Sequence, residues 1–544
     1  MFTDKDIRDI KRTNITGFTG QMAPIENTVA IGTVTPTHHP VKTAIRVSPM
    51  YGLVSIEPTR SPAILTTPGE SVPGWGTVAN AVKEQRPHLL FPREYLMQVR
   101  EAMCLEYATL CLPKTVVYSR RPLKEAIFGN DNVSGLESMY LSTSCGYPLS
   151  LKYNSKRDLI DNETRNISHE VLDSISENMG LRGRNVIPET IWQTCMKDEK
   201  LPMEKIDKPR IINASPLEFT ITSRQYMIDF FMAIQNNRLK MPCSVGISPI
   251  SIEWSLLASA LLTKGTKICT GDFSKFGPRL GSELLYTNCK IMNSWYKRFA
   301  QHCPGLNKDQ LIREKLFLEL MNSTQVAGDL LYHTLCGSPS GFTGTVIQNS
   351  LAAEQYIKIA WLALMDGTEF AGLSSFNTHV KLFTYGDDVI FSISDEICEI
   401  FNNETLHNFF KQYDIKYTDA DKFGNMRKYC SIYEASFLKC TFVPFEDDPR
   451  FFISCVPKLI LEDTLNWYRN TQFVDTAMIQ ICDSVIIQSF GHGRKYFKRM
   501  RDSMVNYWSA KGIVYYAKTY EEVAKIYGFN SPIEKWVTRP HNFE

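Results

Sequence analysis

Tyr385-Gly386-Asp387-Asp388 stands between two short runs of apolar, β-branched and aromatic residues, at 380–384 and 389–393. Such runs on both sides of a Gly-Asp join predict a β-hairpin. The hairpin would hold two adjacent carboxylates at its tip, where water or a cation must offset their mutual repulsion. A surface turn without function has the same pattern, so the interpretation depends on the rest of the chain.

Another acidic residue lies upstream, in Thr266-Lys267-Ile268-Cys269-Thr270-Gly271-Asp272-Phe273, which is predicted to be a short strand ending in an Asp. The chain between Asp272 and Asp387 is long enough to return and place the two strands side by side. Three carboxylates from two strand ends could then hold a pair of Mg²⁺ ions about 3.5–4 Å apart. Such a pair activates an attacking hydroxyl and neutralises a leaving pyrophosphate. Alone, Asp272 would be a strand-end cap or an ion-pair partner.

A glycine-rich loop lies between these acids, at 337–345, and a helical run follows it at 346–362. Its small residues allow close backbone approach, and its Ser and Thr residues offer hydroxyls at the start of a helix. These features suit a loop that follows a sugar-phosphate backbone, and a capped turn has them as well. Pro339 at the central position excludes a nucleophile elbow, and the loop lacks the lysine of a Walker loop.

The composition is that of an ordinary globular protein, with 43% apolar and 22% charged residues among 544. The formal net charge of +2 gives no sign of a nucleic-acid partner, so any basic surface must be local. The 14 cysteines form no CxxC pair and no Cys/His cluster, which argues against structural zinc and a disulfide framework. The first residues are unlike a signal peptide and no apolar run approaches membrane-spanning length, so we expect a cytosolic protein.

The remaining pattern divides the chain into regions. Residues 14–90 are rich in Thr, Pro, Gly and Val and are predicted to be strap-like extended segments on a larger body. Strands separated by helices at 266–393 indicate an α+β or α/β core, and the chain after Pro449 is predicted to be mostly helical. A cluster at 494–501 has five bases and no acids, with Tyr496, Phe497 and Met500 expected on the buried face of an amphipathic helix.

Taken in order, the motifs resemble those of viral RNA-dependent RNA polymerases, most closely the picornavirus-like supergroup. Asp272, then Ser340-Gly341 with Thr345 and Asn349, and then Tyr385-Gly386-Asp387-Asp388 are similar to motifs A, B and C. Motifs G and F are matched by Thr143-Ser144-Cys145-Gly146-Tyr147-Pro148 and by Lys197-Asp198-Glu199-Lys200 with Lys208-Pro209-Arg210-Ile211-Ile212. Motifs D and E are matched by Thr418-Asp419-Ala420-Asp421-Lys422 and Phe437-Leu438-Lys439-Cys440. The resemblance covers about residues 90–510, and the extended N-terminal region is similar to that of insect picorna-like viruses, either iflaviruses or dicistroviruses.

The resemblance implies an α+β fold, the right-hand polymerase with fingers, palm and thumb, closed by an N-terminal fingers strap. It assigns 1–225 to the fingers with the strap, 226–285 to the first part of the palm, 286–335 to a fingers insertion, 336–448 to the rest of the palm and 449–544 to the thumb. The activity it implies is template-directed ribonucleotidyl transfer in the replication of a viral RNA genome.

The resemblance also assigns roles to single residues. Catalysis would fall to Asp272, Asp387, Asp388 and Lys422, with Lys422 as the general acid. Mg²⁺, for which Mn²⁺ could substitute, would be held at Asp272, Phe273, Asp387 and Asp388. The nucleotide would contact Lys197, Lys208, Arg210, Ser340, Thr345 and Asn349. The RNA would contact Thr143, Ser144, Gly146, Tyr147, Pro148, Gly341, Leu438, Lys439, Arg494, Lys495 and Lys498.

Two positions depart from the picornavirus pattern. Gly277 stands where motif A carries a second Asp, which helps the motif B Asn to recognise the ribose 2′-hydroxyl. We therefore expect Asn349 and a neighbour or a water to bind the 2′-hydroxyl. Asn213 stands where motif F carries a Glu, and this exchange is expected to loosen an ion pair that supports Arg210.

Two other functions agree with part of the pattern. A reverse transcriptase also carries a Tyr-x-Asp-Asp hairpin, but that class usually has a bulky aromatic gate soon after motif A, where this chain has Gly277. A non-catalytic RNA-binding protein on a decayed polymerase fold would be expected to have lost its catalytic residues first. The expected partners are RNA, ribonucleoside triphosphates, a protein primer and other viral replication proteins. The expected location is the host cytoplasm, at membrane-associated replication complexes that the chain reaches through its partners.

Overall fold

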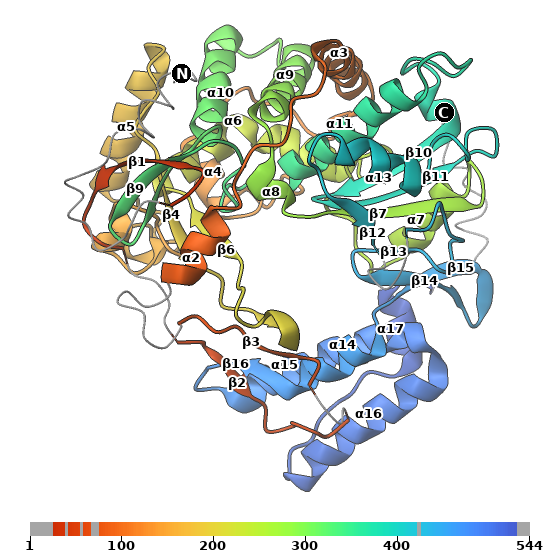
Figure 1. The fold of residues 1–544 in the computed structure, drawn as a ribbon. Coiled ribbons are helices and arrows are strands. Elements are labelled where there is room, and N and C mark those ends of the chain that lie inside the picture. The colour runs from red at the N-terminus through yellow and green to blue at the C-terminus, as the bar shows by residue number, and fades with distance from the viewer. Residues whose placement is uncertain (1–24, 38–41, 55–57, 67–74, 421–425, 530–544) are drawn as a thin grey trace.

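Figure 1 shows the computed structural model, which describes residues 25–37, 42–54, 58–66, 75–420 and 426–529. Three bodies follow one another around the view: a mixed body around β1, β9 and β4, a central sheet with β7, β10 and β11, and a C-terminal body with α15 and α16. No helix in the described ranges combines the length and the apolar character needed to cross a membrane.

The central sheet has four antiparallel strands in the order β10-β11-β7-β12. These are β10 (Val380–Tyr385), β11 (Asp388–Ile393), β7 (Lys267–Phe273) and β12 (Tyr417–Asp419). The predicted hairpin is therefore confirmed, and so is the prediction that the strand of Asp272 lies beside it. Both faces of the sheet are covered, which is why β10 and β11 carry apolar residues on both sides.

Alternate side chains of these strands belong to two different cores. Ile268, Phe383 and Ile390 pack with Trp254 of α7 (Glu253–Leu261) on one face. Their neighbours on the other face join a larger core under α11 (Thr345–Leu364), α13 (Asn403–Lys411), α3 (Arg93–Leu110) and α9 (Ser282–Phe299). This alternation fixes the register, because a slip of one residue would exchange the two faces.

A second sheet has five strands in the order β1-β9-β8-β4-β6, and its one parallel pair is β4 with β8. The strands are β1 (Thr28–Thr33), β9 (Leu330–Thr334), β8 (Thr324–Ala327), β4 (Ile191–Met196) and β6 (Ile211–Ala214). The helices of this body are α4 (Leu123–Phe128), α5 (His169–Gly183), α6 (Leu217–Asn236) and α10 (Leu306–Leu320).

Buried ion pairs join three of these helices. Arg182 of α5 donates to Glu218 of α6 and to Glu319 of α10, and none of the three side chains is more than 5% exposed. Burial by itself would lower the pKa of Arg182, but the hydrogen bond to Glu319 and the charges of both carboxylates raise it overall. Arg121 binds Asp229 of α6 through two nitrogens.

Short N-terminal strands connect the mixed body with the C-terminal one, as the expected strap should. β2 (Ile45–Val47) pairs with β16 (Trp467–Arg469), and β3 (Arg60–Pro62) pairs with β5 (Lys200–Pro202). Met50 is buried in the core of the C-terminal body. Segments from opposite ends of the chain therefore lie side by side, as Figure 1 shows for β2 and β16.

The C-terminal body contains α14 (Lys458–Asp463), α15 (Val474–Ser489), α16 (Gly493–Ala510) and α17 (Tyr520–Ile526). A three-stranded sheet of β13 (Ser436–Phe437), β14 (Cys440–Phe445) and β15 (Asp448–Cys455) connects it to the centre. Single turns of 3₁₀-helix lie at Leu149–Leu151, Lys156–Asp158, Met203–Lys205, Thr464–Asn466 and Phe490–His492.

One expectation about local structure is wrong in part, and another needs a more exact boundary. The segment expected to be extended up to residue 90 contains a helix, α2 (Trp75–Val82), because Val78 and Val82 reach a buried cluster at helical spacing. The chain after Pro449 first completes β15, which pairs with β14, and is mostly helical from Lys458 on, as predicted.

Candidate functional site

The three carboxylates of the hairpin and its neighbour meet at one edge of the central sheet. Asp388 lies directly opposite Asp272 in the β11–β7 ladder, so both side chains extend from the same face. Directly opposite residues of an antiparallel pair have Cα atoms about 4.5–5.5 Å apart. Asp387 is exposed in the turn, while Asp272 and Asp388 are partly exposed. The site is thus open to solvent above an apolar sheet.

The turn that carries Asp387 is fixed by helix α11. Gly386 has φ +66°, a conformation that favours glycine, and its N–H donates to Ser350 Oγ at 2.8 Å. The hydroxyl of Thr384 donates to the Ser350 carbonyl at 3.0 Å. Ser350 of α11 therefore binds both sides of the turn, and the motif B helix fixes the position of the motif C carboxylates.

The donor chemistry of this edge fits magnesium. Among the described residues, no three His, Cys, Asp or Glu side chains converge closely enough to form a complete metal cage. Mg²⁺ is usually held by one or two carboxylates, with waters and substrate phosphates in its other positions, so an open edge of this kind suits it. The side chain of Phe273 is buried, so its backbone carbonyl is the group it could offer. Lys422, the expected general acid, lies outside the described residues.

Arg210 lies within the electrostatic reach of this edge. A hydrogen bond to Glu199 raises the pKa of Arg210, and the charge of Asp387 adds to that increase. Glu199 accepts from Nε of Arg210 at 2.9 Å and from Nη2 as well, and the Arg210 side chain is 68% exposed. Lys197 lies 3.9 Å from the same carboxylate, and Lys208 is exposed. These hydrogen bonds to Glu199 use Nε and Nη2 and leave Nη1 as a further donor.

The expected loosening of Arg210 by Asn213 is wrong. Glu199 from the neighbouring strand segment supplies the carboxylate, so the ion pair exists without a Glu at 213. Asn213 instead donates to Thr194 Oγ1 and Gln325 Oε1, while its own backbone N–H donates to Ser340 Oγ at 3.1 Å. The Asn therefore ties motif F to the motif B loop.

Gly277 and Asn349 are neighbours, as the ribose-binding prediction needs. Gly277 lies in the short helix α8 (Phe276–Arg279), and a Cβ placed on it would lie 3.5 Å from Asn349 Nδ2. The buried Oδ1 of Asn349 has no hydrogen-bond partner among the described residues. A polar atom buried in this way gains by accepting a hydrogen bond from a ligand.

The motif B loop is closely packed against motif F. Gly341 donates to the Asn213 carbonyl at 2.9 Å, and a Cβ on Gly341 would lie 2.2 Å from that oxygen. Thr345 Oγ1 donates to the Phe342 carbonyl at 2.7 Å, so this hydroxyl shapes the loop. Ser340 is exposed and accepts from Asn213. Only glycine fits at 341, because any side chain would separate the two motifs.

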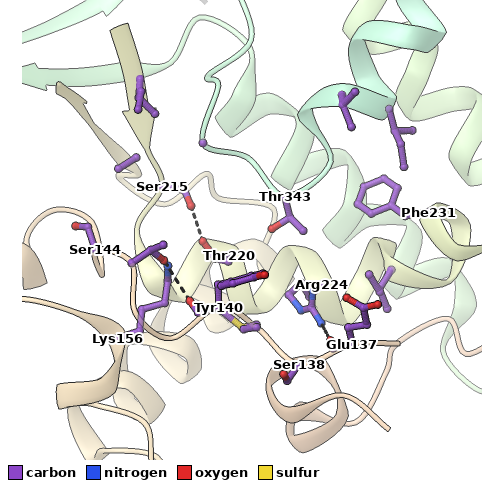
Figure 2. A pocket seen from close by; sticks show the side chains of 18 of the residues that line it. Glu137, Ser138, Tyr140, Ser144, Lys156, Ser215, Thr220, Arg224, Phe231 and Thr343 are labelled. Carbon is purple, nitrogen blue, oxygen red and sulfur yellow. Dashed lines mark hydrogen bonds between the residues drawn. The ribbon is translucent and has the colours of Figure 1, made fainter. Parts of the chain in front are cut away.

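A cavity of about 680 Å³ brings motifs G, F and B together (Figure 2). Its wall includes Thr143 and Ser144 from motif G, Ile212 from motif F, and Gly341 from motif B. Gly146 has φ +71°, and a Cβ there would lie 2.2 Å from the Ser215 carbonyl, so the motif G loop lies tightly against the start of α6. Tyr147 is partly buried behind it and Pro148 is exposed.

Motif E and the basic cluster of α16 lie farther along the chain. Leu438 and Lys439 form the turn between β13 and β14, with φ +52° and +61°. On α16, Tyr496, Phe497 and Met500 are buried as expected. Arg494 pairs with Asp447 and Glu521, and Lys498 pairs with Asp502, whereas Lys495 is exposed and has no ion pair among the described residues.

Sequence reasoning did not single out Glu199, Lys156 or Arg224. Glu199 stands in the quoted motif F run, but its role depends on how residues 199 and 210 pair in space. Lys156 donates to Thr143 Oγ1 on the cavity wall, and Arg224 donates to the carbonyls of Ala126 and Glu137 beneath it. No local pattern distinguishes Arg224, because α6 also carries Glu218 and Asp229.

Comparison with known proteins agrees with this arrangement. A family model described as viral RNA-dependent RNA polymerase matches residues 103–510. The genome polyprotein of Deformed wing virus is 34% identical over 421 residues, which cover 74% of this chain and 14% of the polyprotein. The replicase polyprotein of Cricket paralysis virus is 27% identical over 495 residues, 87% of this chain and 28% of the polyprotein. The chain thus spans less than a third of either polyprotein.

Among solved structures, the sicinivirus 3Dpol RNA-dependent RNA polymerase is similar in fold, with a TM-score of 0.74 and 20% identity. The match covers 92% of this chain and 98% of that one. The expected α+β fold of a right-hand polymerase is therefore confirmed, while the residue boundaries of its fingers, palm and thumb stay predictions.

Proposed function

Because the chain belongs to the viral RNA-dependent RNA polymerase family, we propose that it copies viral RNA by adding ribonucleoside 5′-triphosphates to an RNA 3′-hydroxyl. The observation that carries the proposal is the ladder register that sets Asp388 opposite Asp272, with Asp387 in the adjoining turn. Arg210 close to Asp387 supplies the complementary charge.

The residues at the sheet edge would bind the divalent cation and the nucleotide. Asp272 and Asp387, assisted by Asp388 and the Phe273 carbonyl, would hold Mg²⁺ or, in its place, Mn²⁺. A bound pair of such ions lowers the pKa of the attacking hydroxyl and offsets the charge of the leaving pyrophosphate. Arg210, with Lys197 and Lys208, would orient the triphosphate, and Arg210 would use Nη1, the nitrogen that its hydrogen bonds to Glu199 leave available. By resemblance, Lys422 would donate a proton to the pyrophosphate.

Asn349 would bind the ribose. Its partnerless Oδ1 can accept from the 2′-hydroxyl, and the space that Gly277 leaves beside Nδ2 can admit a water. Ser340 would lie next to the nucleotide, and Thr345 would act by holding the loop in shape. A reverse transcriptase is disfavoured because no bulky residue closes the site at Gly277.

The cavity of Figure 2 is the proposed entry path of the template. Thr143, Ser144 and Gly341 would contact its backbone, and Gly146, Tyr147 and Pro148 would support that wall. The product duplex would pass the turn at Leu438 and Lys439 and the exposed bases of α16. Since Arg494 and Lys498 already have acidic partners, Lys495 is the α16 base best placed for a phosphate. A protein primer and other replication proteins are the proposed partners, and host-cytoplasmic replication complexes at membranes are the proposed location.

The test is primer extension on a short RNA hairpin with Mg²⁺, comparing rNTPs with dNTPs. Extension with rNTPs and not with dNTPs is expected. Equal use of dNTPs would contradict the proposed ribose recognition and favour a reverse-transcribing enzyme. RNA binding without any extension, in Mg²⁺ and in Mn²⁺, would favour a non-catalytic RNA-binding protein.

A further inference from the structure

Tyr140 is a large aromatic residue that is 82% exposed although it lies on the wall of the cavity. In the view of Figure 2 its ring lies among the lining side chains, with Lys156 on one side and Arg224 on the other. Exposure of this extent is unusual for an aromatic ring in a concave site, because packing against a neighbour would remove apolar surface from water.

The backbone around Tyr140 is held firmly. The Met139 N–H donates to the Ile127 carbonyl at 2.8 Å, and the Thr143 hydroxyl donates to the Tyr140 carbonyl at 3.2 Å. Arg224 donates to the Glu137 carbonyl three residues earlier, and its guanidinium is mostly buried, since the residue is 9% exposed. Burial lowers the pKa of Arg224 to about 10. The exposed ring is therefore anchored at its Cα and is not part of a loose loop.

The Tyr140 side chain is left open by its neighbours in the described part of the chain. Among those residues, none hydrogen-bonds to its hydroxyl or stacks on its ring. Beside apolar side chains, the cavity wall that includes Tyr140 carries the hydroxyls of Ser138, Thr143 and Ser144 and the ammonium of Lys156. A fixed aromatic face beside phosphate-binding groups is the combination that single-stranded nucleic acid requires, since bases stack on the ring while cations follow the backbone.

We propose that Tyr140 is a stacking platform for one base of the single-stranded template on its way to the hairpin carboxylates. The inference rests on the proposed function, and it adds a residue that lies outside the seven motifs. The contact is independent of sequence, because every base presents a π-face. It would hold one unpaired base in a fixed place before that base reaches the pairing position.

The first experiment follows a fluorescent base along the template. A primed RNA hairpin carries 2-aminopurine at successive positions of its 5′ single-stranded overhang, and fluorescence is read on binding to wild type, Tyr140→Phe and Tyr140→Ala. Quenching at one overhang position is expected for wild type and Tyr140→Phe, and it should be lost in Tyr140→Ala. Equal quenching in all three proteins, or none at any position in wild type, overturns the proposal.

Affinity for the overhang RNA supplies the second readout. Tyr140→Ala should bind about 5- to 150-fold more weakly, the equivalent of 1–3 kcal/mol per stacked base at 1.4 kcal/mol per tenfold. The slope of log Kd against log salt should stay that of wild type, because no phosphate contact is removed. Lys156→Gln is the matched contrast. It should reduce the slope of log Kd against log salt by about 1, as expected for the loss of one phosphate contact, and it should leave the quenching in place.

A third variant controls for the loss of any exposed tyrosine. Tyr286 lies on α9, 42% exposed and outside the cavity wall, so Tyr286→Ala should change neither quenching nor affinity. Unchanged affinity in Tyr140→Ala would also overturn the proposal. Extension of the same hairpin by wild type tests the polymerase function separately. Failure of extension would contradict the polymerase function, whereas unchanged quenching or affinity in Tyr140→Ala would contradict the stacking role of Tyr140.

Discussion

Acidic side chains serve differently in two regions of this molecule. At the edge of the central sheet, Asp272, Asp387 and Asp388 are at least partly exposed on strand ends. In the mixed body, Glu218 and Glu319 are buried against Arg182 between three helices. The first group remains accessible to cations from solution, whereas the second has its cation within the protein. The same residue type therefore stays accessible to ions from solution at the exposed sheet edge and joins helices of the fold in the mixed body.

The comparison predicts opposite results for one neutral substitution in each region. Asp387→Asn removes a charge from an exposed turn and little packing, so it should abolish RNA synthesis while thermal unfolding and RNA binding stay near those of wild type. Primer extension, differential scanning fluorimetry and a binding titration measure the three quantities. Substantial residual synthesis by the variant would sink the assignment of Asp387 as a metal ligand.

Glu319→Gln is the matching change in the mixed body. It weakens the charge-assisted hydrogen bonds that buried Arg182 donates to residue 319, while Glu218 remains as a partner, so the fold should lose about 1.5–3 kcal/mol while each folded molecule keeps its activity. Chemical unfolding and extension per active site are the measurements. Glu314→Gln on the same helix is the control, because its partner Lys290 is 30% exposed and such pairs contribute about 0.2–1 kcal/mol. Equal destabilisation by both variants would contradict the distinction between the two regions.

The sequence predicts the first region better than the second. Tyr385-Gly386-Asp387-Asp388 carries its turn, its strands and its acids within a few residues, so local pattern predicts all three. The Arg182–Glu319 pair joins residues 137 positions apart, and no local pattern indicates such a contact. Asn213, which stands where the family pattern has a Glu, shows the same limit. Its expected effect on Arg210 did not take account of Glu199 on the facing segment, which supplies the carboxylate. Tyr140 also could not be predicted, because exposure inside a cavity is a property of the folded chain.

Glu199 combines features of both groups of acids, because its own side chain is 10% exposed while that of its partner Arg210 is 68% exposed. Burial tends to raise its pKa, but the hydrogen bond and charge of Arg210 lower it overall. Glu199→Gln should free Arg210 from its carboxylate and raise KM for rNTPs about five- to tenfold, with a smaller change in kcat and in stability. Steady-state extension over a range of rNTP concentrations measures both constants. Glu204→Gln, an exposed acid of the same loop, is the control, and an equal KM for both variants would argue against Arg210 as a triphosphate ligand.

The smallest expected effect concerns a carboxylate that the chain lacks. Gly277→Asp would add an acid beside Asn349, where a Cβ meets nothing closer than Nδ2 at 3.5 Å, so the fold should accept it. The new carboxylate can accept from Nδ2 and orient the amide so that Oδ1 faces the 2′-hydroxyl. A hydrogen bond of this kind contributes about 0.5–1.5 kcal/mol, so discrimination of rNTPs over dNTPs should rise about two- to tenfold. Competition extension measures the ratio, and Gly277→Ala, which adds the Cβ without the charge, should leave it unchanged. If Ala and Asp change the ratio alike, bulk at 277 and not its charge sets the sugar preference, and the exposed acids of this edge would serve the cation alone.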